Sequence, residues 1–444
     1  MQTNSSYGIE LRKQNISIRP TLEIYRSAVK YLTEIYEKVW EELSRISDAQ
    51  KRFNAAEHLI HTTEKNLARF DFDFRFPKMP SYLRRSASRR ALGNISSYKT
   101  KMDLWEKSKE KGGKPRLGYE NHAMPVFYRE KMYREGAEGK DEAYLKLYDG
   151  HDWKWFRVQL SHTDMEYLRK NWYGKRASAP TLEKKHHKYF LRFTYKEKVA
   201  LTKTRIKEQI ICSVDMGINT DAVCSIMRGD GTVLGRKFID HPSEKDQMYR
   251  TLGRIRRFQR EHGSAHTKGR WAYTNHLNID LSKKIAGAIV KYAEENQVDV
   301  IVFEYLEMRG KISGKAKQKL HLWRKRDIQT KCECLAHRKG IRISRICARN
   351  TSSLAYDGSG EVLRDSKNYS LCVFKTKKQK QYNCDLSASY NIGARYFIRE
   401  LLKPLPATER SLLEAKVPPV KRRTSCVYAD LRELYLQMKV LKIA

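Results

Sequence analysis

The chain has 444 residues, which is room for two or three domains of ordinary size. Hydrophobic residues make up 40% and charged residues 32%, a balance that argues against global disorder and predicts a real core. Lys and Arg number 89 against 51 Asp and Glu, so the net charge of +38 indicates a polyanionic partner rather than a basic surface without a ligand. The basic residues interleave with 26 Tyr, 14 Phe and 7 Trp, a mixture that suits single strands and RNA.

Membrane insertion and secretion have no support in the sequence. No apolar run approaches the roughly 20 residues of a membrane span, and the first residues, "MQTNSSYGIELRK", contain no signal-peptide core. The eight cysteines are scattered and form no C-x-x-C pair. We therefore expect a reduced cytoplasmic protein with free thiols and no membrane partner.

The first 200 residues predict a β domain that a helical block interrupts. Residues 7–19 alternate like a strand, and an amphipathic helix with Thr21 as a plausible cap follows Pro20. Helical spacing continues to about residue 107, apart from the alternating run "RFDFDFRF" at 69–76, which favours a strand. From about 116 to 200 the pattern changes to short strands separated by turns, typical of a small barrel or sandwich.

The second half predicts an α/β domain with a mixed sheet. Three strands come first as an antiparallel meander, then a basic helix and a loop, and then helix, strand, helix, strand and helix in turn. The strands are expected at 210–217, 221–228, 232–239, 298–306 and 341–348, and the helices near 249–263, 278–296, 319–339 and 385–401, with a loop at 264–271. An amphipathic helix in the tail is expected to pack back on this domain.

Three acidic residues occupy comparable places in this half. Asp215 ends the first strand, Glu304 ends the fourth, and Asp385 opens the last helix. Neighbouring parallel strands would bring the first two carboxylates side by side, and a helix on that face can add the third. Carboxylates gathered this way repel one another unless a cation joins them, and hard oxygen ligands suit magnesium or manganese. Each acid also has a structural interpretation, because strand ends and helix N-caps favour acidic residues.

The three acid motifs also carry a family resemblance. "SVDMGINTDAVCSI", "IVFEYL" and "DLSASYNIGARY" are similar to the split motifs of a RuvC-type nuclease domain with the RNase H-like fold. The chain resembles transposon-encoded TnpB nucleases and, equally, the compact type V CRISPR effectors. The stretch after Glu304, with its Thr351–Ser352 pair, also matches, whereas Ser387 stands where the third motif has Asn. The likeness covers about 205–400 well and the first 200 residues in architecture alone.

The resemblance implies an α/β RuvC nuclease domain together with β-barrel and helical parts. It divides the chain into a wedge-like β domain at 1–20 and 116–204, a helical recognition insert at 21–115, a RuvC domain at 205–350 and 384–404, a degenerate zinc-ribbon segment at 351–383, and a C-terminal tail at 405–444. It makes Asp215, Glu304 and Asp385 both the catalytic residues and the ligands of magnesium or manganese.

The zinc ribbon of the family is the main departure. Its two C-x-x-C knuckles would fall near Ala355 and Gly358 and near Lys375 and Lys378, where no cysteine remains. We therefore expect no zinc site. In the family this segment loads DNA into the nuclease site. Lysines of the segment are predicted to make that contact by binding phosphate: Lys375, Lys377 and Lys378.

Further nucleic-acid contacts are predicted on the basic stretches of the second half. Sequence would be read by base pairing with a guide, so the protein should contact shape and backbone. The candidates are Arg254, Arg256, Arg257, Arg260, Lys268, Arg270, Trp271, Trp323, Arg324 and Lys325. Each arginine alone also fits a solvated surface, and Trp323 also fits a core.

The function that follows from the resemblance is an RNA-guided DNA endonuclease that binds beside a short flanking motif. Its partners would be a guide RNA and target double-stranded DNA, and it would act as a monomer or as a dimer on one RNA in the prokaryotic cytoplasm, associated with the nucleoid. Two alternatives stay open. One is an RNA-guided repressor that does not cut efficiently, and the other is a RuvC-like nuclease that needs no guide.

Overall fold

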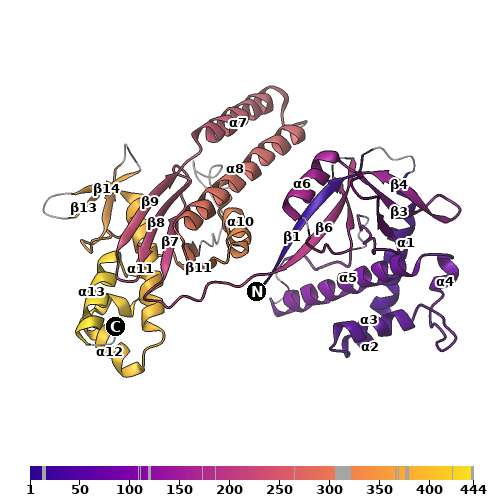
Figure 1. The fold of residues 1–444 in the computed structure, drawn as a ribbon, viewed down its shortest axis with the longest axis horizontal. Helices are drawn as coiled ribbons and strands as arrows, with labels where there is room; N and C mark the ends of the chain where they lie inside the picture. The colour runs from indigo at the N-terminus through magenta and orange to yellow at the C-terminus, as the bar shows by residue number, and fades with distance from the viewer. Residues whose placement is uncertain are drawn as a thin grey trace. The chain divides into compact units, whose positions relative to one another are not determined.

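The computed structural model divides the chain into two compact units, one formed by Gln2–Glu197 and the other by Lys198–Ala444 with Met1 (Figure 1). The residues that it describes are 1–12, 17–108, 110, 112–118, 122–172, 174–185, 187–264, 266–305, 322–365, 368, 370–375, 380–422 and 424–441. None of the described helices is long and apolar enough to cross a membrane.

Two three-stranded antiparallel sheets form the β part of the first unit. One sheet has the order β1-β6-β5 and the other β2-β3-β4. Single bridges, such as Leu11 to Leu160, join them. The strands are β1 (Gln2–Glu10), β2 (Tyr133–Glu135), β3 (Glu142–Tyr148), β4 (Trp153–Gln159), β5 (Thr181–Lys185) and β6 (Lys188–Lys198). The prediction of short strands after residue 116 is confirmed, while β1 lies several residues before the predicted strand.

Among the described residues between β1 and β2 the elements are helices, as the sequence predicts, but the first begins at Arg19, so Thr21 lies inside it and is not its N-cap. The helices are α1 (Arg19–Lys38), α2 (Trp40–Ser44), α3 (Ala49–His58), α4 (Phe72–Arg75) and α5 (Ser81–Lys107), and α6 (His162–Trp172) follows β4. The long pair α1 and α5 packs together, and its buried side chains share one hydrophobic core with the two sheets. A single core explains why a helical insert and a split β part behave as one unit.

The strand predicted at 69–76 is wrong. A strand would place all four phenylalanines of this run on one face, yet Phe74 is 87% exposed while Phe72 is fully buried. The turn of α4 instead brings Phe72 and Phe76 together, with ring centroids 4.8 Å apart, because residues four apart meet on a helix. Tyr31 on α1 completes this cluster.

A five-stranded mixed sheet organises the second unit, as the sequence predicts. Its order is β11-β10-β7-β8-β9, with β10 parallel to both neighbours and β8 antiparallel to both of its own. The strands are β7 (Ile210–Asp215), β8 (Ala222–Arg228), β9 (Val233–Ile239), β10 (Val300–Tyr305) and β11 (Arg342–Cys347). The meander β7-β8-β9 is therefore confirmed, and crossover helices connect the parallel strands.

Helices cover both faces of this sheet. On one face α11 (Cys384–Leu402) packs on side chains such as Ile211 and Val300, and α13 (Tyr428–Val440) packs on α11. On the other face α8 (Lys268–Glu295) and α10 (Lys325–Arg338) pack on side chains such as Val214 and Phe303. The tail helix thus returns to the body of the unit, as predicted. The tail also contains α12 (Ala407–Lys416) and the short helix η1 (Pro418–Lys421).

The helix α7 (Pro242–His262) pairs with α8 (Figure 1). The loop predicted at 264–271 is too long, because α8 begins at Lys268 and the Trp271 amide already donates to the Thr267 carbonyl at 3.0 Å. Lys268, Arg270 and Trp271 therefore belong to the first turn of α8. The buried Thr267 anchors that turn.

Residues 351–383 contain a small sheet of their own. Its antiparallel strands are β12 (Val362–Arg364), β13 (Leu371–Phe374) and β14 (Gln381–Asn383). The sheet closes over an apolar cluster of Ala355, Cys372, Phe374 and Cys384, against which Tyr356 and Tyr382 pack. Burial of aromatic rings is what holds together the part of this segment that the structure describes.

Candidate active site

The alternation of side chains along each strand determines on which face of the sheet the acids lie. Side chains alternate between the two faces of a strand, so Ile211, Ser213 and Asp215 of β7 share a face. Val300 pairs with Ile211 in register, so Val300 and Glu304 lie on that same face. This is the face that α11 covers, and Asp385 is in the first turn of α11. All three acids are thus directed to one layer of the unit.

Burial and mutual repulsion perturb the three carboxyls. Asp215 and Glu304 are each 8% exposed, and Asp385 is half-buried. Burial, followed by the charges of Glu304 and Asp385, raises the pKa of Asp215 well above its usual value. Burial likewise raises the pKa of Glu304 and the pKa of Asp385. Each acid therefore resists ionisation unless positive charge is nearby.

Glu304 is the best supported of the three. The Thr351 hydroxyl donates a hydrogen bond to its carboxylate, and the Gln329 side chain donates to its carbonyl at 2.9 Å. The charges of Arg395 and the buried Lys325 act in the same sense as Thr351, lowering the pKa of Glu304 against the larger effect of burial. The Thr351 hydrogen bond orients the carboxylate, and the Gln329 hydrogen bond holds the backbone of the strand end.

Arg364 is a residue that the sequence analysis missed. It lies on β12, and its guanidinium favours the ionised forms of both Asp215 and Asp385, lowering each pKa against the effect of burial. No local pattern marks it, because only the pairing of β12 with β13 brings residue 364 toward the acids. A cation here is suited to contact a phosphate held by the carboxylates.

Gly217 is required by a close approach of the backbone. A Cβ atom at this position would lie 2.7 Å from the Thr220 carbonyl oxygen and 3.8 Å from the Asp385 carboxylate. The first distance is shorter than any normal contact, so the turn after Asp215 tolerates no side chain without moving.

Two residues of the third motif act as structural ties. Asn391 is fully buried and donates to the carbonyls of Thr351 at 3.0 Å and Leu354 at 2.9 Å, while its side-chain oxygen accepts from the Tyr428 amide at 3.0 Å. Ser387, the departure from the motif, accepts a hydrogen bond from the Tyr356 amide at 3.2 Å. Asn391 thereby positions the Thr351 loop that supports Glu304.

The donor chemistry of the three acids fits a divalent cation. All the available ligands are carboxylate oxygens, and their repulsion is what a cation would relieve. Among the described residues, however, no three His, Cys, Asp or Glu side chains are grouped closely enough to hold a metal ion. Holding one would require these carboxylates to approach one another more closely than they do here.

The predicted nucleic-acid residues fall into three groups. Exposed positions on α7 carry Arg254, Arg256, Arg257 and Arg260, and exposed positions on the first turn of α8 carry Lys268 and Arg270, with Trp271 beside them. Lys375 is exposed after β13, whereas Lys377 and Lys378 lie outside the described residues.

The third group sits before and at the start of α10. Arg324 pairs with Asp327 at 3.0 Å, and Lys325 is buried, so neither offers a simple surface charge. The Lys325 ammonium instead lies 5.2 Å from the centre of the Trp323 ring. The Trp323 side chain is half-buried and packs against the core of the second unit. The structure thus brings the charge of Lys325 to Glu304 and leaves the α7 and α8 cations on the surface.

Comparisons with known proteins agree with this architecture at the level of the fold. A family model, described as the Aq_aa04 family, matches residues 5–149. No curated protein matches the sequence. Among solved structures, the Cas12f1–sgRNA–target DNA complex is similar with a TM-score of 0.51 at 16% identity, over 84% of this chain and 80% of that one. The mixed α/β fold with several small sheets therefore resembles that of Cas12f1.

Two further solved structures are more distant. The C2c1–single-guide RNA complex of Alicyclobacillus acidoterrestris has a TM-score of 0.44 at 8% identity, over 86% of this chain and 68% of that one. The Cas12i1 R-loop complex after target DNA cleavage has a TM-score of 0.40 at 9% identity, over 94% and 60% of the two chains.

Proposed function

We propose that the chain is an RNA-guided DNA endonuclease with one RuvC-type, RNase H-like active site. The observation that carries the proposal is the convergence of Asp215, Glu304 and Asp385 on the layer between the five-stranded sheet and α11. The fold likeness to Cas12f1, a protein solved with sgRNA and target DNA, and the net charge of +38 support a guided, nucleic-acid-directed role.

The domain division expected from the sequence belongs to the same proposal. In it, residues 1–20 and 116–204 form the wedge-like part, 21–115 the recognition insert, 205–350 and 384–404 the nuclease, 351–383 the degenerate ribbon, and 405–444 the tail. The element order supports it, since helices α1 to α5 interrupt the β part of the first unit and β12 to β14 interrupt the second.

The chemistry supplied by magnesium or manganese at the carboxylates would be activation of a water and stabilisation of the leaving oxygen in phosphodiester hydrolysis. Asp215, Glu304 and Asp385 are the residues that would hold it. Thr351 orients Glu304, Asn391 positions the Thr351 loop, and Arg364 presents a cation to a phosphate at the acids. The expected products carry a 3′-hydroxyl and a 5′-phosphate.

The test is cleavage of a guide-matched plasmid by the full chain purified with its own RNA. Asp215→Ala, Glu304→Ala and Asp385→Ala should each reduce the rate by at least about 100-fold, because each removes a ligand of the cation. Binding of the plasmid should stay nearly intact. The control is Asp240→Ala, an exposed acid outside the site. Normal cleavage by Glu304→Ala would show that the assigned site is wrong.

A second candidate is an RNA-guided DNA-binding protein that represses without cutting. The feature that favours it is the departure from the resembled family's zinc ribbon, since Ala355, Gly358, Lys375 and Lys378 stand where its cysteines fall. Under this alternative the purified complex binds guide-matched DNA and leaves it intact with either magnesium or manganese, and Asp215→Ala behaves like the wild type. Protein that purifies with no defined RNA would contradict both candidates.

A further inference from the structure

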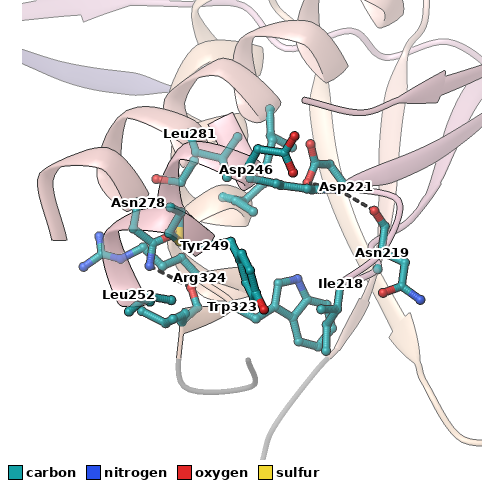
Figure 2. Close-up of a pocket in the computed structure, with 17 residues that line it drawn as sticks. Ile218, Asn219, Asp221, Asp246, Tyr249, Leu252, Asn278, Leu281, Trp323 and Arg324 are labelled. Atoms are coloured by element: carbon teal, nitrogen blue, oxygen red, sulfur yellow. Dashed lines mark hydrogen bonds and ion pairs between the residues drawn. The ribbon is translucent and has the colours of Figure 1, made fainter. Parts of the chain in front are cut away.

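A cavity of about 410 Å³ opens inside the second unit, on the side of the sheet that α8 and α10 cover (Figure 2). Its walls are α7, α8, the turn that follows β7 and the residues just before α10. The volume lies within the roughly 300–1,000 Å³ of small-molecule sites. The proposed cleavage chemistry does not use this space, and of the predicted nucleic-acid contacts Trp323 and Arg324 line it.

Apolar side chains and two aromatic rings dominate the lining. Met248, Leu252 and Leu281 come from the α7–α8 pair, and the rings of Tyr249 and Trp323 also border the cavity. Tyr249 is 69% exposed, an unusual state for a large aromatic residue at the rim of a cavity. Flat rings beside an aliphatic wall are a surface on which another flat ring can stack.

Two polar groups of the lining have no partner among the described residues. The Trp323 Nε1 atom is buried and makes no hydrogen bond there, although buried indole N–H groups usually find an acceptor. The Asp246 carboxylate likewise forms no ion pair in that part of the chain. The cavity therefore offers one unused donor and one unused acceptor.

The cations of the lining are already engaged. Lys245 pairs with Asp221 at 3.0 Å, and Arg324 pairs with Asp327 at 3.0 Å and donates to the Asn275 side chain at 3.2 Å. With Asp246 also present, a phosphate would meet more negative than free positive charge. A flat, neutral ring with hydrogen-bonding edges suits this lining better than an anion does.

Residues on two sides of the cavity are neighbours of the acids. Gly217 and Ile218 follow Asp215 directly in the chain. On the other side, the Lys325 ammonium lies 5.2 Å from the centre of the Trp323 ring, and its charge lowers the pKa of Glu304 against the effect of burial. Gly217 also lies close to a third acid, because a Cβ atom on it would be 3.8 Å from the Asp385 carboxylate oxygen. The lining of the cavity thus adjoins the acids at Gly217, where the base of a nucleotide bound by its phosphate at the acids can enter.

We propose that this cavity binds an unstacked nucleobase of the strand held at Asp215, Glu304 and Asp385, with stacking on Tyr249 and Trp323 and hydrogen bonds to Trp323 Nε1 and the Asp246 carboxylate. The inference rests on the proposed function in one respect, that a nucleic-acid strand reaches the acids. It adds a base-recognition site that the cleavage chemistry does not require.

The first experiment compares short single-stranded DNA with an abasic strand of the same length, in buffer without divalent cations so that nothing is cut. Tyr249→Ala should weaken binding of the base-bearing strand about tenfold and leave the abasic strand unchanged, because stacking needs a base and phosphate contacts do not. Trp323→Phe, which keeps a ring and removes the N–H, should give a smaller loss with the same selectivity. Phe238→Ala, at another exposed aromatic residue, is the control.

Equal weakening of both strands by Tyr249→Ala, or no weakening of either, would overturn the proposal. A second measurement is photo-cross-linking of the full chain to a strand that carries 5-iodouracil, mapped by peptide mass spectrometry. Cross-links to Tyr249 or Trp323 are expected, and cross-links confined to surface residues such as Trp271 would contradict the proposal.

The outcome is separable from that of the nuclease test. Cross-links in the cavity together with unchanged cleavage by Asp215→Ala would overturn the nuclease site alone. Loss of cleavage in Asp215→Ala without cross-links in the cavity would overturn the base site alone.

Discussion

At the scale of single residues, ionisation of the buried acids of the site destabilises the folded chain. Burial and neighbouring negative charge raise the pKa of Asp215, so its ionised form destabilises the folded chain. Thr351, Lys325 and Arg395 reduce this cost for Glu304 without removing it. A group of buried acids that weakens the fold is typical of a functional site, because nothing in packing requires it.

Replacing Asp215 by Asn should stabilise the protein in the absence of divalent cations. The folded state raises the pKa of Asp215, so the penalty of its charge is largest at high pH, shrinks as pH falls through the raised value, and is gone below the unfolded value near 4. The gain should amount to about 1.4 kcal/mol for each unit by which folding raises the pKa. Thermal unfolding from pH 4 to pH 8 measures it.

The control for this measurement is Glu433→Gln, an exposed acid on α13, which should change the midpoint little at any pH. A constant effect of Asp215→Asn across the pH range would mean that charge is not the cause. Addition of magnesium should raise the unfolding midpoint of the wild type more than that of Asp215→Asn, since ligand binding to the folded state stabilises it.

Another residue-scale prediction concerns Asn391, which joins α11 to the Thr351 loop and to α13. Asn391→Ala leaves two carbonyls and one amide without their partner in a buried place. We expect a loss of about 3 kcal/mol in the free energy of unfolding, because each unsatisfied buried group costs roughly 1–3 kcal/mol. Denaturant unfolding measures it, with Gln437→Ala on the surface of α13 as the comparison. A loss similar to that of the control would show that water replaces these bonds.

At the scale of elements, the segment 351–383 has its own means of staying folded. Tyr356, Phe374 and Tyr382 pack with centroids 4.9 to 5.7 Å apart, and Lys380 donates to the Tyr356 hydroxyl at 2.8 Å. This cluster occupies the stretch where the resembled family places its zinc knuckles. Contacts among buried aromatic rings can stabilise such a small sheet, as a bound structural metal would, because short strands alone supply too few contacts.

Phe374→Ala should therefore open this segment while the five-stranded sheet stays folded. Truncating a fully buried Phe costs about 3–5 kcal/mol, more than a three-stranded sheet this small is expected to tolerate. Limited trypsin digestion followed by mass spectrometry should show rapid cleavage confined to 351–383. Leu363→Ala, at an exposed position of β12, should leave the cleavage rate unchanged. Digestion spread evenly over the second unit would instead mean that the small sheet is part of one cooperative core.

At the scale of the whole molecule, charge is the dominant property. Under the proposed function, a net charge of +38 over 444 residues predicts that binding to nucleic acid is mostly electrostatic and releases counterions. The arginines of α7 are exposed while its Leu252 and Ile255 are buried, so this helix presents cations to solvent. The two units each have a core of their own, so the charge is carried on two separately packed bodies.

Affinity for DNA should consequently fall about 1,000-fold or more between 50 and 200 mM salt, as for proteins with six or more phosphate contacts. Arg254→Ala or Arg257→Ala should each reduce the slope of log affinity against log salt by about 1, without changing sequence preference. Fluorescence anisotropy over a salt series measures the slope. Lys291→Ala, whose ammonium pairs with Glu295, is the control. An unchanged slope in both arginine variants would remove α7 from the binding surface.

The sequence by itself determined the chain order of the five-stranded sheet and its connecting helices, and the positions of the three acids, but not the small sheet of β12 to β14. Those strands and helices are long, strongly periodic and bounded by clear turns, so local pattern was enough. It failed at 69–76, where alternation of Phe and Asp predicted a strand, because packing of Phe72 and Phe76 on Tyr31 overrode local pattern.

Only the tertiary structure decided which side chains meet. The parallel pairing of β7 and β10 puts Asp215 and Glu304 on the face that α11 covers, and the small sheet of 351–383 brings Arg364 toward them. The burial of Lys325 beside Trp323 and the cavity next to it have no local signal either. The physical reason is that strand register and helix packing depend on contacts between residues far apart in the chain. The periodic pattern of apolar residues reports only on residues close together in the sequence.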